Sequence, residues 1–469
     1  MDRSPKAALA KTRVFASRLP PPMTQPPNPP PDPTTPALAA DSAAALPAGR
    51  WYQRVGPGLI TACVVIGPGS ITTSSQVGAK YGYSTLWLVV LSVILMSTFM
   101  SMGARLGVVA GVSPGTLLAR HGSRPFAIFL SGCIFFMAAA FQFGNNLGIY
   151  AAMAEFEPLI SKVPGLKLPY LVVLFNGLAI SFLFAFQNLY KALERLMMLF
   201  VGVMLVSFAV NLAYARPNLM EVLTGLVPPV WLLRGDGISR AEIDLSLLGL
   251  IGTTFVIAGA YFQAYLVRQK GWGKPELARG MVDARVGAML MMLITLMLIS
   301  TAAGALRGVE IKEPRDIAAG LTIFGTMGRV MFCAGLFSAA YSSFLVNSMV
   351  GGFVLSDGLG LGSEPRQWAP RLATTAVLLV GMFVALFTIA SGTKPMPAIV
   401  FGQAVTVIAS PLVAAVLLWL CNRRDVMGED RNGWGSNVLG GLGLATLLAM
   451  ATYTATNKVW PEVSGWLGR

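Results

Sequence analysis

The sequence predicts an all-α integral membrane protein with about 11 transmembrane helices. Hydrophobic residues make up 55% of the 469 residues and charged residues 12%, whereas soluble globular domains carry roughly 25% charged residues. So few charges cannot cover a water-facing surface of this size, and most of the surface is therefore expected to face lipid. Apolar stretches of about 20 residues, the length that crosses a bilayer core, recur along the chain.

The first 50 residues differ in composition from the rest. Residues 20–36 are rich in proline and residues 37–48 in alanine, and the segment lacks the apolar core of a signal peptide. A sequence of this kind cannot bury enough apolar surface to offset the loss of chain entropy on folding. We expect a disordered cytoplasmic tail over 1–50, a transmembrane domain over 51–455 and a short tail over 456–469.

Eleven hydrophobic segments follow, separated by clusters of charged and turn-forming residues. Open-ended elements in lipid satisfy all their backbone polar groups only as helices, so each segment is predicted to be helical. The segments lie near residues 53–79, 86–110, 125–154, 168–187, 196–214, 245–270, 286–306, 329–354, 372–390, 397–420 and 437–455. Connectors on the side of the N-terminus carry a small excess of Lys and Arg, which favours a cytoplasmic N-terminus in a bacterial inner membrane.

Reactive side chains are scarce. The cysteines Cys63, Cys133, Cys333 and Cys421 fall in apolar segments without paired spacing, which indicates buried free thiols. The only histidine, His121, lies in a connector. The sequence has no phosphate-binding glycine-rich loop, and its basic residues are scattered rather than gathered on one face. These observations exclude a histidine-based metal site in the membrane and argue against an enzyme, a cofactor or a nucleic-acid partner.

The first segment is interrupted in its middle by Gly67-Pro68-Gly69. Proline removes a backbone hydrogen bond and glycine adds conformational freedom, so a helix break is predicted there, with Ser70 capping the following half-helix. The sixth segment has a weaker break signal at Gly259, between two alanines. Interrupted helices at corresponding places in two halves are typical of a transporter whose site lies at the bilayer midplane. Glycine-lined helix packing is the alternative interpretation.

Several stretches resemble the Nramp metal-transporter family in order and spacing. RVGPGLITACVVIGPGSITTSSQVGAKYGYSTLW resembles the first family helix, whose pattern is GPG, an apolar run, DPGN and then GAKYGY. The second, eighth, tenth and eleventh family helices are matched by Arg105-Leu106-Gly107, AGLFSAAYSSFLVNSMVGGFV, VFGQAVTVIASPLVAAVLLWLCNRRDVMG and SNVLGGLG. The resemblance implies a LeuT-type inverted 5+5 repeat with helices 1 and 6 broken. Its parts are repeat one over about 51–215, repeat two over about 244–422 and an eleventh helix over about 437–455.

The residues that define the family's chemistry are replaced in this sequence. The Asp of DPGN, which the resemblance implies is the main metal ligand, corresponds to Gly67, and its Asn corresponds to Ser70. The family's MPH motif on the sixth helix supplies a methionine ligand and a histidine. Its three positions correspond to Val256, Ile257 and Ala258.

The proton-coupling positions are replaced as well. Acidic residues that the family carries on its third helix correspond to Gln142 and Asn145, and a Gln of the eighth helix corresponds to Tyr341, whereas Gln403 of the tenth is retained. Transition metals require thiolate, imidazole or carboxylate ligands, and a proton relay requires a titratable group in the membrane. Standard proton-coupled manganese or iron transport is therefore expected to be absent.

The broken helices still predict a binding site, where free carbonyls and half-helix N-termini meet. Without an acidic ligand, such a pocket favours an anionic or zwitterionic small solute. The residues expected to bind it are Gly67, Ser70, Thr253, Val256, Ala258, Tyr341 and Gln403, with further polar groups at Thr72, Thr73, Thr254, Tyr261, Gln263 and Ser342. No metal site is predicted.

Three functions remain open at this point. They are a secondary transporter of a small non-metal solute, a transporter of a largely hydrated divalent cation such as Mn²⁺ or Mg²⁺ held by neutral ligands, and a non-transporting sensor. The expected partners of a monomeric chain are the lipid bilayer and a small solute or ion. Asp283 and Arg285 are expected to form an ion pair or gate at the inner start of the seventh helix. Lys191, Glu194 and Arg195 are expected to form an inner connector cluster.

Overall fold

The chain divides into two compact units, Met1–Gly49 and Arg50–Arg469. The computed structural model describes residues 56–186, 188–228, 245–311, 314–392 and 395–459, and gives only the backbone at 245, 315, 395–405 and 458–459. The first unit, with the tail predicted over 1–50, lies outside the described residues, as does most of the tail predicted over 456–469. The description below concerns the second unit.

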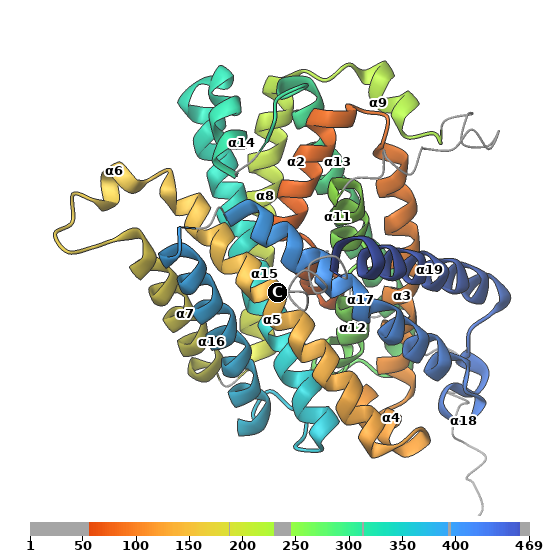
Figure 1. The fold of residues 1–469 in the computed structure, drawn as a ribbon. Coiled ribbons are helices and arrows are strands. Elements are labelled where there is room, and N and C mark those ends of the chain that lie inside the picture. The colour runs from red at the N-terminus through yellow and green to blue at the C-terminus, as the bar shows by residue number, and fades with distance from the viewer. Residues whose placement is uncertain (1–55, 187, 229–244, 312–313, 393–394, 460–469) are drawn as a thin grey trace, which may run out of the picture. The chain divides into compact units, whose positions relative to one another are not determined.

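All regular structure in the described residues is helical (Figure 1). The long helices are α3 Leu86–Val109, α5 Arg124–Ala154, α7 Leu168–Ala185, α8 Leu189–Ala215, α13 Leu277–Ala305, α15 Gly325–Leu359, α16 Trp368–Ala390, α17 Pro395–Asn422 and α19 Trp434–Thr454. The half-helices are α1 Pro57–Val65, α2 Pro68–Tyr81, α11 Leu245–Thr254 and α12 Ile257–Gln269. The short ones are α4 Pro114–His121, α6 Glu157–Ile160, α9 Leu219–Gly225, α14 Pro314–Gly320 and α18 Arg424–Met427.

The predicted fold class is confirmed. Nine helices of the described chain are long and apolar enough to cross a membrane, and the number rises to 11 when each of two bent helix pairs is taken as one span. One pair is α1 with α2, bent by 59°, and the other is Thr406–Asn422 with Arg424–Asp430, bent by 63°. Each of the eleven predicted segments corresponds to one of these spans.

Some helices extend beyond the apolar segments that predicted them. The seventh segment was expected near 286–306, whereas α13 begins at Leu277. Its first turns carry Arg279, Asp283 and Arg285, so hydropathy alone places the start too late. Proline marks other starts correctly, because its fixed backbone angle suits a first helical position that needs no N–H. Pro57 and Pro68 begin α1 and α2 in this way.

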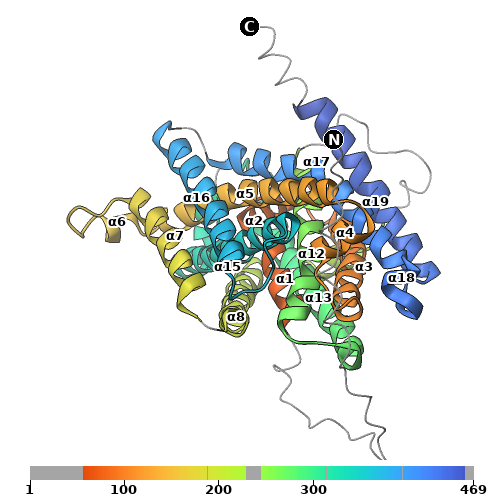
Figure 2. The ribbon, with the colours of Figure 1, turned by 90° about the horizontal axis from the view of Figure 1, so that it is seen from below.

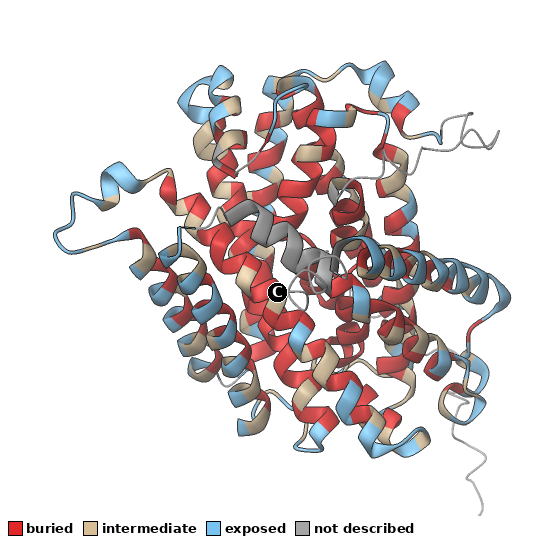
Figure 3. Cartoon of the chain, in the orientation of Figure 1, coloured by how far each residue is buried: buried red, intermediate tan, exposed pale blue. Residues whose placement is uncertain are grey.

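The two broken helices lie in the interior of this unit. Seen along the bundle, α1, α12 and α15 occupy the middle, with α5, α3, α13 and α8 around them (Figure 2). The α11–α12 span is the more buried of two extremes, since 94% of an 18-residue stretch of it is buried, against 28% of such a stretch in the α19 span (Figure 3). Helices α7, α16 and α19 therefore present their exposed apolar side chains, such as Phe387 at 76% exposure, to the lipid.

Candidate functional site

The first helix is broken where the sequence predicts it. Helix α1 ends at Val65, Ile66 and Gly67 are unwound, and α2 begins at Pro68. A Cβ atom at Gly148 of α5 would collide with the Pro68 ring, so that glycine makes room for the break. Gly67 itself is extended (φ −122°, ψ −178°), a conformation that any residue adopts.

Ser70 does not cap α2, contrary to the prediction. It is the third residue of the helix, and the N-terminus of α2 has no side-chain cap among the described residues. The Ser70 hydroxyl instead donates to the carbonyl oxygen of Val65 at 2.5 Å. The serine thus adds a second hydrogen bond to the last carbonyl of α1, which also accepts from the Gly67 amide at 3.0 Å.

The second break lies earlier than predicted. Helix α11 ends at Thr254, and α12 begins at Ile257, so Phe255 and Val256 form the break. Gly259 is part of α12, and a Cβ atom there would lie 3.3 Å from the nearest atom of Val64. The glycine therefore allows α12 to approach α1 closely and does not break the helix.

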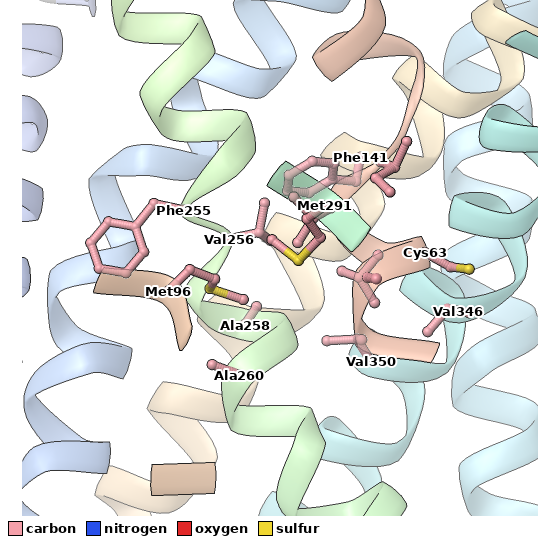
Figure 4. Close-up of a cluster of buried hydrophobic side chains, with 14 of the residues drawn as sticks. Cys63, Met96, Phe141, Phe255, Val256, Ala258, Ala260, Met291, Val346 and Val350 are labelled. Carbon is pink, nitrogen blue, oxygen red and sulfur yellow. The ribbon is translucent and has the colours of Figure 1, made fainter. Parts of the chain in front are cut away.

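Apolar side chains occupy the space around both breaks (Figure 4). Val256 and Ala258 are buried, with 2% and 4% of their surfaces exposed. They are grouped with Cys63 of α1, Phe141 of α5 and Met291 of α13 in one buried cluster. These two residues, at the methionine and histidine positions of the family's MPH motif, thus contribute hydrocarbon and no donor atoms.

Polar side chains gather on one flank of the first break. The Ser343 hydroxyl and the Asn347 amide of α15 both donate to the Val64 carbonyl, at 3.2 and 3.3 Å. A Cβ atom at Gly67 would lie 3.0 Å from Ser343 Oγ and 3.3 Å from Asn145 Oδ1. The unwound segment is therefore bordered by hydroxyl, amide and carbonyl groups, all of them neutral.

A chain of buried amides leads away from this flank. Asn145 donates to Gln142 Oε1 at 3.0 Å, Asn146 donates to the Gln142 carbonyl at 2.8 Å, and Asn176 of α7 donates to Asn146 Oδ1 at 2.7 Å. Gln142 Nε2, Asn145 Oδ1 and Asn176 Oδ1 have no partner in the described chain. The positions that correspond to the family's acidic residues thus hold hydrogen-bonding groups that cannot titrate.

The other predicted polar residues lie apart from one another. Thr253 contacts Thr73, with 3.3 Å between their hydroxyl oxygens, and this contact joins the half-helices α11 and α2. The Gln263 amide donates to the Pro57 carbonyl of α1 at 3.0 Å and is also hydrogen-bonded to Thr61. Gln263 thus ties the half-helices α12 and α1 together.

Further residues of the predicted set lie in helices. The Tyr341 ring stacks on Phe337, and its hydroxyl is 3.5 Å from the Phe175 carbonyl, so it lies among aromatic rings of α7 and α15. Thr72, Thr254, Tyr261 and Ser342 are buried within helices. Gln403 belongs to α17, but its side chain lies outside the described residues.

Two buried carboxylates hold the half-helices at the end where α1 begins. The expected Asp283–Arg285 ion pair is wrong, because Arg285 is exposed on the opposite side of α13. Asp283 instead accepts hydrogen bonds from the amides of Gly56 and Gly58, at 2.7 and 2.6 Å. Lys270 and Glu194 form an ion pair of 2.7 Å beside Gly56.

The second carboxylate was not singled out in the sequence. Asp357 of α15 accepts hydrogen bonds from Ser113 Oγ (2.6 Å), Gly115 N (2.8 Å), Thr116 Oγ1 (3.1 Å) and Tyr265 Oη (2.7 Å). It joins α15 to α4 and to α12, with only 2% of its surface exposed. The sequence does contain a signal for Asp357, because it is the only acidic residue in a long apolar segment and lies in the stretch SDGLG.

The composition of the site limits its chemistry. No group of three or more His, Cys, Asp or Glu side chains suited to a metal ion occurs in the described part of the chain. Ser343, Asn347, Asn146 and Asn176 were missed by sequence reasoning, although polar amides inside apolar segments are themselves a signal of buried polar contacts. The arrangement offers neutral hydrogen-bond donors and acceptors beside an apolar wall.

Comparison with known proteins places the chain in a family. The family described as natural resistance-associated macrophage protein-like (Nramp) matches residues 58–457. A protein of Deinococcus radiodurans named divalent metal cation transporter MntH is 26% identical over 446 residues, covering 90% of this chain and 95% of that protein. A protein of the same name from Verminephrobacter eiseniae is 25% identical, covering 88% and 91%.

Solved structures agree on the fold. The Eremococcus coleocola manganese transporter, crystallised with an aromatic bis-isothiourea compound, superposes with a TM-score of 0.73 at 18% identity, over 87% of this chain and 88% of that one. A nucleobase-cation-symport-1 family transporter superposes with a TM-score of 0.53 at 14% identity. The chain therefore belongs to the Nramp family and is a multi-pass membrane transporter, not an enzyme.

Proposed function

We propose that this chain is an alternating-access transporter of a small polar non-metal solute. The observation that carries the proposal is the neutral character of every polar group beside the first break. Asn145, Ser343, Asn347 and the carbonyl groups of Val64 and Val65 offer hydrogen bonds but no charge. The amide donors and unpaired amide acceptors suit a zwitterionic or uncharged solute that both donates and accepts.

A dehydrated transition-metal ion fits this environment poorly. Such ions are bound by thiolate, imidazole or carboxylate groups, and the family's ligand positions hold Gly67, Val256 and Ala258 here. Moving a divalent charge into a buried site lined by neutral groups costs many kcal/mol of lost hydration. The proposed substrate therefore carries no net positive charge that the protein would have to neutralise.

We further propose that the chain acts as a monomer in a bacterial inner membrane with its N-terminus in the cytoplasm. In that orientation α1 and α12 are the cytoplasmic half-helices, and the contacts of Asp283 and Asp357 close the cytoplasmic side. Substrate release then requires α1 to move away from α13. The excess of basic residues in connectors on this side supports the orientation.

Transport of a divalent cation is the second candidate. It is favoured by the relatives named divalent metal cation transporter, which align over most of their length. It is also favoured by Asn145 Oδ1, an unpaired oxygen beside Gly67 that could contact the water shell of a hydrated ion. In this case the ion keeps most of its water, because the protein offers no charged ligand in its place.

Calorimetric titration with Mn²⁺ and then Mg²⁺ decides between the two candidates. We expect no binding heat from the parent protein. A variant with Gly67→Asp, Ser70→Asn and Val256→Met is expected to show saturable Mn²⁺ binding, because the added carboxylate is a ligand that this ion prefers. The backbone at Gly67 suits aspartate, whose Cβ would sit 3.0 Å from Ser343 Oγ and require a shift of a few tenths of an ångström.

The matched control carries Gly67→Ala with the same two partner substitutions, so that only the carboxylate differs. Saturable binding of either ion by the parent protein at micromolar concentration would overturn the non-metal proposal in favour of the second candidate. If the parent protein gives no binding heat with either ion, thermal-shift measurements with small zwitterions and anions then identify the class of solute.

A further inference from the structure

We propose that Asp283 is a proton-binding site whose protonation releases α1 and opens the side of the molecule where α1 begins. The inference rests on the alternating-access function proposed above and adds its coupling ion. It concerns a position outside those where the family carries its third-helix acids, which are Gln142 and Asn145 here.

The contacts of Asp283 are confined to the moving half-helix. Its two carboxylate oxygens accept one backbone N–H each, from Gly56 and Gly58, and 1% of its surface is exposed. These amides belong to the first turn of α1, which has no side-chain cap of its own. Asp283 therefore supplies the cap from α13, and its negative charge is favoured by the helix dipole.

Protonation removes both sources of this attraction. A carboxylate accepts hydrogen bonds at both oxygens, whereas a carboxylic acid carries a donor on one of them. With one N–H facing each oxygen, the added proton weakens one of the two bonds from α1, because a hydroxyl oxygen is a poorer acceptor than a carboxylate oxygen. The charge that favours the N-terminus of α1 is lost at the same step, so protonation weakens the hold on α1 twice.

The charged groups around Asp283, with Asp283 itself, carry one negative charge more than they carry positive charge. Helix α8 contributes Glu194 and Tyr190, and α12 contributes Lys270 at its end. The fields of Lys270 and Glu194 both act on Asp283, whereas the first turn of α1 offers no titratable side chain. Two carboxylates thus face one ammonium group, and Lys270 is already paired with Glu194 at 2.7 Å. Asp283 is the member of the cluster that has no cationic partner within the described residues.

Asp357 is buried to a similar degree but is held differently. Each of its oxygens accepts two hydrogen bonds, from Ser113 and Thr116 at one and from Gly115 and Tyr265 at the other. Four donors, from the start of α4 and from α12, hold this carboxylate, so Asp357 is a fixed link between these helices and α15. Asp283, with two donors from a single mobile element, is the better placed group for reversible protonation.

Cys63 provides a native reporter for this step. It lies on α1, is fully buried and belongs to the cluster drawn in Figure 4. In a background with Cys133→Ala, Cys333→Ala and Cys421→Ala, the rate of its reaction with N-ethylmaleimide reports how often α1 leaves its place. Each rate is divided by that of the unfolded protein at the same pH, which removes the thiol's own pH dependence.

The corrected rate is expected to rise on acidification in the background protein, approaching tenfold per pH unit for a single titrating group. The Asp283→Asn variant is expected to react about tenfold faster than the background at alkaline pH, because asparagine imitates the neutral acid, and to show no pH dependence. Asp283→Glu, which keeps the titratable group, should retain the pH dependence and establishes that the site tolerates substitution. Arg285→Gln, on the exposed side of the same helix, and Asp357→Asn should leave the pH profile unchanged.

A corrected rate with the same pH profile in Asp283→Asn as in the background would overturn the assignment. Loss of the pH dependence in Asp357→Asn would also overturn it, because Asp357 would then be the titrating group. If Cys63 stays unreactive in every variant at every pH, α1 does not move, and the assignment fails together with alternating access. The Mn²⁺ titration requires no movement of α1 and therefore tests the substrate proposal separately.

Discussion

Replacing Asp357 by alanine is expected to lower the free energy of unfolding by at least about 3 kcal/mol. The substitution leaves four buried donors without their acceptor, on Ser113, Gly115, Thr116 and Tyr265. Each unpaired buried donor costs about 1–3 kcal/mol, and the losses add incompletely because the freed groups can rearrange. The measurement is the thermal melting of the purified protein in detergent.

The size of the loss should depend on how many acceptors remain. Asp357→Asn keeps one carbonyl oxygen and is expected to lose roughly half as much stability as Asp357→Ala. Glu364→Ala provides the matched control, because Glu364 is a nearby acid with 59% of its side chain exposed and is expected to melt like the parent. An Asp357→Ala variant that melts with the Glu364→Ala control would show that Asp357 does not hold α4, α12 and α15 together.

The first break illustrates what a sequence can predict. Pro68 lacks the N–H that a continuous helix needs, so the break follows from one residue whatever surrounds it. The second break contains no proline or glycine, and the sequence predicts it three residues late, at Gly259. Its residues, Phe255 and Val256, follow two threonines. This run of β-branched and aromatic side chains disfavours a helix only weakly, so the break also depends on tertiary packing.

The direction in which a helical side chain points explains the other misplaced residues. Asp283 and Arg285 were expected to pair, but residues two apart on a helix point to different faces. Tyr341 was placed in the site by its correspondence with the family, whereas Ser343 and Asn347, one turn apart, form the face that meets Val64. Which face of α15 turns inward is decided by its packing on α5 and α1, and the hydrophobic pattern of so apolar a helix does not report it.

The partners of Asp357 show a different limit. Ser113 and Asp357 are separated by 244 positions in the chain. A short-range sequence pattern cannot connect them, because their contact depends on the tertiary packing of α4 against α15. The neutral character of the site, by contrast, could be inferred from residue types alone, because no arrangement of Gln142, Asn145, Ser343 and Asn347 creates a titratable group at neutral pH.

The second large effect is expected at the contact between α3 and α12. Gly103 and Gly107 lie one turn apart on one face of α3, and a Cβ atom on either would meet the backbone of α12 at Ala260 or Ala264. This is the small-residue packing through which membrane helices approach closely. Gly103→Val and Gly107→Val are each expected to destabilise the protein by about 1–3 kcal/mol, with a larger loss in the double variant and a lower yield of monodisperse protein.

Gly132 of α5 separates the packing effect from the effect of losing a helical glycine. A Cβ atom at Gly132 would meet no atom within 4 Å, so Gly132→Val should melt at or above the temperature of the parent, because valine is favoured over glycine in a helix. If Gly103→Val and Gly107→Val melt like Gly132→Val, α3 and α12 are not in backbone contact. Because α12 is one of the two half-helices that border the site, a shift of α12 away from α3 would also carry Val256 and Ala258 out of the apolar wall. We therefore expect these two glycines to influence both the stability of the bundle and the position of the second break.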